Sequence, residues 1–151
     1  MKQLTDLATD FASVAQNSTL AGQDLAWLNE LRQQATVQFK NNSLPAKKVE
    51  DWKYTSLWSL AQQSFTHSAD EFSVTAEQCE QVALLKGGYR IVIIDGVFSP
   101  ALSTIDSLET GLNIAPFSSS VNSVNQTLGQ HVDIAKAGLT ALNTMLMNEG
   151  V

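Results

Sequence analysis

The sequence of 151 residues has little that supports redox or metal chemistry, since it contains one cysteine, Cys79, and two histidines, His67 and His131. A single cysteine excludes an intrachain disulfide, and protein metal sites usually combine Cys and His at short spacings such as Cys-x-x-Cys. No such spacing occurs. Cys79 also lies beside Glu77 and Glu80, a setting that disfavours the reactive thiolate. The sequence therefore predicts no metal-ligating residue and no bound cofactor, with Cys79 as a structural or incidental thiol and both histidines in ordinary surface or capping positions.

Long apolar runs are also missing. The best run, residues 91–94, has four residues, whereas about 20 are needed to cross a bilayer. The N-terminal residues include Asp6 where a signal peptide has an apolar stretch. We therefore expect a cytoplasmic location and no membrane partner.

Positive charge is scarce, with nine Lys and Arg against fifteen Asp and Glu, a formal net charge of -6. Binding of nucleic acid calls for clustered cations that neutralise phosphates, so the balance argues against a nucleic-acid partner. The cations are unevenly spread, because residues 32–53 carry five of the nine alongside two acids. The basic segment 40–53 is thus either a docking surface for a partner or a solvated face.

Signs of catalysis are absent. There is no Gly-x-Ser-x-Gly nucleophile motif, and Gly87-Gly88 precedes a predicted strand, whereas phosphate-binding loops follow a strand and open a helix. The sequence predicts no catalytic residue, and we expect that the protein is not an enzyme.

Apolar spacing predicts two amphipathic helices in the first third of the chain. Leu4, Leu7, Phe11 and Val14 recur at intervals of three and four, and the same period resumes from Trp27 and continues to residue 39. Pro45 cannot continue the second helix. Each helix needs a packing partner, because an isolated helix of this length is marginally stable in water.

The rest of the chain is predicted to mix short helices with a small sheet. Gly87-Gly88 and Asp95-Gly96 bound a β-branched run, which favours a buried strand followed by a type I′ turn. We predict helices at residues 57–61, 76–85 and 137–148. Strands are predicted at 89–94 and 97–98, with a weaker strand at 111–115. The fold class is therefore α+β: an N-terminal helical domain (residues 1–86), then a small β-sheet and a closing helix (residues 87–151).

Residues 44–57 combine a proline, two acids, three lysines and large aromatic side chains just after the second helix. Trp52 and Tyr54 carry much apolar surface, so we expect them to be anchored rather than left in a solvated loop. One interpretation is an aromatic cluster that locks the helices together, formed by Trp27, Trp52, Tyr54 and Trp58. A stacking platform for single-stranded nucleic acid is the other, which the acidic balance disfavours.

The core of this segment has the pattern Glu-x-Trp-Lys-Tyr-Thr, formed by Glu50, Trp52, Lys53, Tyr54 and Thr55. It resembles a signature in the N-terminal region of the SufD family, scaffold subunits of Suf-type iron-sulfur cluster assembly. Further positions fall in the order typical of that family, namely Trp27, Leu28, Arg32, Ala35, Phe39, Pro45, residues 90–103 and residues 141–143.

The resemblance implies that the chain is an N-terminal fragment preceding the family's long β-helix. It implies a non-catalytic, architectural role, with SufB and the ATPase SufC as partners of the full-length protein. The family's cluster-related cysteine and histidine residues lie beyond this region, so no cofactor is expected in the fragment. The signature is then a structural or an interaction motif. The alternative is a free-standing protein-binding module that uses the basic segment 40–53.

Overall fold

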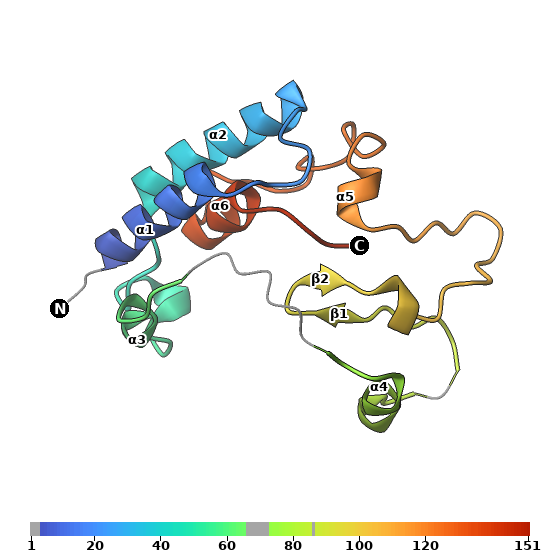
Figure 1. The fold of residues 1–151 in the computed structure, drawn as a ribbon. Coiled ribbons are helices and arrows are strands. Elements are labelled where there is room, and N and C mark those ends of the chain that lie inside the picture. Colours follow the sequence, from blue (N-terminus) through green and yellow to red (C-terminus); the bar gives the residue numbers. More distant parts are fainter. Residues whose placement is uncertain (1–3, 66–72, 86) are drawn as a thin grey trace. The chain divides into compact units, whose positions relative to one another are not determined.

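The computed structural model describes residues 4–65, 73–85 and 87–151, so His67 lies outside the described residues (Figure 1). These residues form helices and one small antiparallel sheet, which confirms the α+β class. The chain divides into two compact units. The helical unit comprises Met1–Ser68 and Asn122–Met147, and the hairpin unit comprises Ala69–Val121 and Asn148–Val151.

The helical unit contains α1 (Leu4–Asn17), α2 (Ala26–Asn42), the 3-10 turn η1 (Glu50–Trp52), α3 (Trp58–Ala61) and α6 (Gly138–Met145). Both predicted N-terminal helices are confirmed. Helix α6 packs along α2, and α1 contacts α2, α3 and α6. Their apolar stripes meet in one core, because residues three and four apart share a helix face. The buried members of this core are Leu7, Ala8, Ala35, Phe39, Leu44, Ala61, Ala141 and Met145.

A close approach between the end of α2 and the start of α6 depends on Gly138. A Cβ atom at this position would lie 1.6 Å from the carbonyl oxygen of Ser43. Ser43 ends α2 with a φ of 54°, and its amide donates to the carbonyl of Phe39 at 2.7 Å. Only glycine leaves room for the two backbones to meet in this way.

Arg32 joins three segments of the helical unit. Its side chain is 7% exposed, and Nη2 donates to the carbonyl oxygens of Ala21 at 2.7 Å and Met147 at 2.6 Å. Arg32 thereby ties α2 to the loop after α1 and to the segment after α6. Burial lowers the pKa of the Arg32 guanidinium from its ordinary value, although such a group stays charged at neutral pH.

The hairpin unit contains α4 (Ala76–Val82), β1 (Ile93–Ile94), β2 (Val97–Phe98), η2 (Pro100–Leu102) and α5 (Phe117–Ser120). The strands pair with Ile93 opposite Phe98 and Ile94 opposite Val97. Asp95 and Gly96 have φ values of 48° and 88°, the two positive values that the predicted type I′ turn requires.

Two further contacts hold the hairpin unit together. Arg90 and Thr104 form an isolated bridge, and Arg90 Nη1 donates to Glu80 Oε1 of α4 at 2.6 Å. This hydrogen bond raises the pKa of the Arg90 guanidinium. Helix α4 is therefore fastened to the segment that leads into β1.

Several predicted elements are shorter than the sequence indicates. The strand at 89–94 pairs regularly only at Ile93 and Ile94, and Val92 N–H donates to the Ser103 hydroxyl instead. The expectation that it is buried is wrong, because Ile91 and Ile93 are 43% and 53% exposed. No strand forms at 111–115. A two-stranded sheet has only one partner per strand, so local β propensity is not enough to extend the ladder.

The predicted boundary after residue 86 does not coincide with the two units. Helix α4 groups with the hairpin, while α6 returns to α1 and α2. The helices predicted at 76–85 and 137–148 end earlier, at Val82 and Met145. None of the described helices has both the length and the apolar character needed to span a membrane.

Candidate functional site

The signature segment follows α2 and folds as a series of tight turns. Leu44, which is buried, anchors its start, and Ala61 of α3 is buried just beyond its end. Between these anchors, amides donate to carbonyls three residues back: Val49 to Ala46, Trp52 to Val49 and Thr55 to Trp52, at 2.9 to 3.0 Å. The turns satisfy the backbone locally and leave the side chains to point outward.

The predicted aromatic cluster of Trp27, Trp52, Tyr54 and Trp58 is not formed. Tyr54 is 90% exposed and Trp58 is 52% exposed, while Trp52 is half-buried. Trp27 lies in the first turn of α2, and at the rise of an α-helix about 22 Å separate it from the end of α2, after which the chain continues to the signature. The rings that stack in this unit are instead Phe11 and Phe65, with centroids 5.2 Å apart.

Lys53 is held by its neighbours within the signature. Its ammonium group pairs with the Glu50 carboxylate three residues earlier, and it lies 5.1 Å from the centre of the Tyr54 ring. Such exposed contacts are weak, with a cation–π pair contributing about 0.5–1 kcal/mol. They orient Lys53 and Tyr54 together without burying either side chain.

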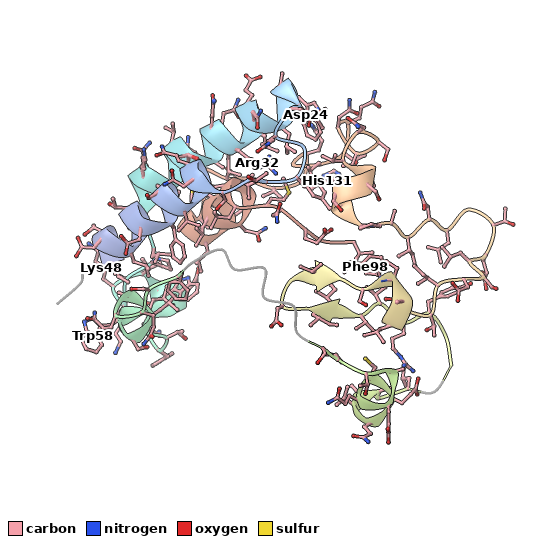
Figure 2. All side chains as sticks on the ribbon, viewed as in Figure 1. Asp24, Arg32, Lys48, Trp58, Phe98 and His131 are labelled. Carbon is pink, nitrogen blue, oxygen red and sulfur yellow. The ribbon has the colours of Figure 1, made fainter. Side chains whose placement is uncertain are left out.

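We call the exposed side of this segment the signature surface, composed of Lys47, Lys48, Val49, Lys53, Tyr54 and Trp58. Figure 2 shows Lys48 and Trp58 at the same end of the helical unit. All six side chains are exposed. Two exposed aromatic rings beside lysines match the composition of protein-binding surfaces, where aromatic residues are enriched and charges lie at the rim. We therefore treat this surface as a candidate site for protein contacts.

The residues singled out for reactivity lie apart. Cys79 is buried in α4 of the hairpin unit, whereas His131 is exposed on a loop of the helical unit. Within residues 4–65, 73–85 and 87–151, no three His, Cys, Asp or Glu side chains gather closely enough to hold a metal ion.

Sequence patterning alone did not single out Arg32 as a buried residue. The signal was present, because Leu28, Arg32, Ala35 and Phe39 recur at helical spacing and all four are buried. A charge on a buried stripe indicates a specific polar environment, here two main-chain carbonyl groups.

Comparison with known proteins agrees with the signature. The family described as the SufBD protein N-terminal region matches residues 1–151. The chain is 39% identical over 71 residues to the iron-sulfur cluster assembly protein SufD of Escherichia coli (strain K12). That match covers 47% of this chain and 16% of the SufD protein. No solved structure gives a significant match.

The described residues form an α+β fold with a helical N-terminal part, which carries the signature on an exposed surface. The match over residues 1–151 makes the assignment specific: the chain belongs to the SufBD family and corresponds to its N-terminal region.

Proposed function

We propose that this chain serves as the N-terminal region of a SufD-like scaffold subunit in iron-sulfur cluster assembly. Its role is architectural and non-catalytic, and it acts through protein contacts in the cytoplasm. The observation that carries the proposal is the family match over residues 1–151, together with the 39% identity to a SufD protein.

The signature surface is the proposed contact site. It exposes apolar area from Val49, Tyr54 and Trp58. Covering this area with a partner would stabilise the complex by roughly 25 cal/mol for each Å² buried. Lys47 and Lys48 would form the rim, where charges affect mainly the association rate and its salt dependence. Glu50, Trp52 and Thr55 shape the turn that presents these side chains.

The partners proposed for the longer, SufD-like protein are SufB and SufC. A stable interface covers about 800 Å² on each partner, which is more than six side chains of one turn provide. We therefore expect residues 1–151 alone to bind SufC weakly.

A second candidate is a free-standing protein-binding module that uses the basic segment 40–53. It is favoured by the exposure of Lys40, Lys47 and Lys48 on an otherwise acidic chain. This module would need no additional domain.

Co-purification distinguishes the two candidates. Residues 1–151 and the protein encoded by the complete reading frame are each expressed with SufB and SufC. The scaffold proposal expects the complete protein to be retained with both partners, and residues 1–151 to retain little SufC. Tight binding of SufC by residues 1–151 alone, lost in Lys47→Glu/Lys48→Glu, would contradict the proposal and favour the module.

A further inference from the structure

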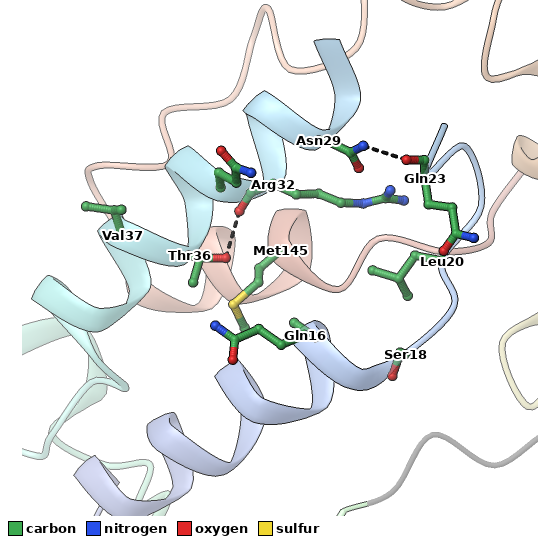
Figure 3. A pocket seen from close by; sticks show the side chains of 11 residues that line it. Gln16, Ser18, Leu20, Gln23, Asn29, Arg32, Thr36, Val37 and Met145 are labelled. Atoms are coloured by element: carbon green, nitrogen blue, oxygen red, sulfur yellow. Dashed lines mark hydrogen bonds between the residues drawn. The ribbon is translucent and has the colours of Figure 1, made fainter. Parts of the chain in front are cut away.

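A hollow of about 550 Å³ lies on the helical unit between the end of α1 and residues 29–37 of α2 (Figure 3). Its volume falls within the roughly 300–1,000 Å³ typical of small-molecule sites. Residues of α1, the following loop, α2 and α6 line it, so its shape depends on the packing of one compact unit.

Arg32 supplies the only charge in the lining. Its Nη2 group is used by the carbonyls of Ala21 and Met147, and its Nε is buried without a hydrogen-bond partner in the described part of the chain. No ion pair joins Arg32 to an acid among the described residues. A buried cation without an anion is unfavourable, and a bound anion would compensate it.

Three glutamines share the lining with this charge. Gln16, Gln23 and Gln33 line the hollow, and their amide groups make no hydrogen bond to another residue in the described ranges. Each amide NH₂ group can donate to an anion's oxygen atoms. Figure 3 shows Gln23 and Asn29 beside the guanidinium end of Arg32.

Apolar groups form the rest of the lining, chiefly Leu20, Val37 and Met145. One cation with neutral donors and apolar walls suits a singly charged acid that carries a short hydrocarbon chain. A phosphate group would call for further cations or a run of backbone N–H groups.

We propose that this hollow binds a small organic carboxylate. The carboxylate group lies toward Arg32 and accepts a hydrogen bond from the Gln23 amide beside it, while the hydrocarbon chain extends along the apolar lining toward Met145. The lining shares no residue with the signature surface, so a test of carboxylate binding is independent of a test of the proposed scaffold role.

The first test is an NMR titration of residues 1–151 with hexanoate, using hexanamide as the neutral isostere. We expect saturable shifts in the Arg32 Nε–H signal and the side-chain amides of Gln16, Gln23 and Gln33. Hexanamide should bind at least about tenfold more weakly, because it loses a charge-assisted hydrogen bond. Equal responses to the two compounds, or no saturable shift with hexanoate, would overturn the proposal.

Charge variants on α2 provide the second test. Gln33→Glu places a carboxylate in the lining and should weaken hexanoate binding about tenfold by like-charge repulsion. Gln34→Glu makes the same charge change one residue away, outside the lining, and should alter the affinity by less than about twofold. Both variants leave Arg32 and its carbonyl partners intact. If the two variants behave alike, or if a glutamate-containing peptide binds there but hexanoate does not, the small-carboxylate site is excluded.

Discussion

Individual residues in this protein take roles that their type alone does not indicate. Arg32 is charged yet buried, and it stabilises the helical unit through two main-chain carbonyls. Tyr54 and Trp58 are large aromatics yet exposed, and they contribute to a surface rather than to the core. Burial, rather than residue type, therefore distinguishes the residues of the core from those of the surface.

This separation leads to a paired prediction for Tyr54 and Phe39. Tyr54→Ala should change the free energy of unfolding by less than about 0.5 kcal/mol, since the side chain is 90% exposed. Phe39→Ala should cost about 3–5 kcal/mol, because it removes a fully buried ring from the core. Urea unfolding measures both values. A large loss in Tyr54→Ala would show that the signature surface is needed for folding rather than for contact.

Gly138 allows a second prediction at this scale. A methyl group in Gly138→Ala would collide with the Ser43 carbonyl, so α2 and α6 must separate, at a cost of about 1–3 kcal/mol or more. Gly150→Ala is the matched control, because nothing lies within 4 Å of its added Cβ. Thermal unfolding of the two variants should show a lower midpoint only for Gly138→Ala. Equal midpoints would contradict the close approach of the two backbones.

At the scale of elements, the short helices depend on their ends. Helix α4 has seven residues and begins with a capping box, in which the Thr75 hydroxyl accepts from Gln78 N–H and the Gln78 side chain accepts from Thr75 N–H. Few internal hydrogen bonds support so short a helix, so its cap makes up a large share of its stability.

Thr75→Ala should therefore destabilise α4 by about 1 kcal/mol, whereas Thr75→Ser, which keeps the hydroxyl, should remain within a few tenths. Hydrogen exchange at the Cys79 amide, which donates to the Thr75 carbonyl, reports the effect. Faster exchange in Thr75→Ala and near-native exchange in Thr75→Ser is the expected pattern. Unchanged protection in both would mean that the cap contributes little.

At the scale of the whole molecule, an acidic chain carries a basic segment and an exposed aromatic surface, with a single cysteine. Protein-bound iron-sulfur clusters are usually held by several Cys or His ligands. Cys79 and His131 lie in different units, and the described part of the chain offers no group of three candidate ligands. We therefore propose that this region supports cluster assembly without itself holding a cluster.

Anaerobic reconstitution of residues 1–151 with iron and sulfide should consequently yield no stoichiometric cluster. Visible absorption and metal analysis would measure the outcome, with Cys79→Ser as the control. A stable chromophore in the original sequence that disappears in Cys79→Ser would refute this prediction.

The sequence by itself determined the two N-terminal helices, the hairpin turn and the family. Helical spacing predicted α1 and α2, the Asp95-Gly96 pair predicted the turn with two positive φ values, and the Glu-x-Trp-Lys-Tyr-Thr signature indicated the SufBD family. These features depend on neighbouring residues, because hydrophobic period and turn chemistry act over a few positions.

Tertiary structure decided what these elements contact. Helix α6 packs against α2 although more than ninety residues separate them, so the two units do not follow the predicted boundary. Arg32 likewise donates a hydrogen bond to the carbonyl of Met147, 115 residues further along the chain. The same packing leaves Tyr54 and Trp58 at the surface, where the sequence had predicted a cluster. Local patterns specify which side of a helix is apolar, but only the assembled core determines which distant residue covers it.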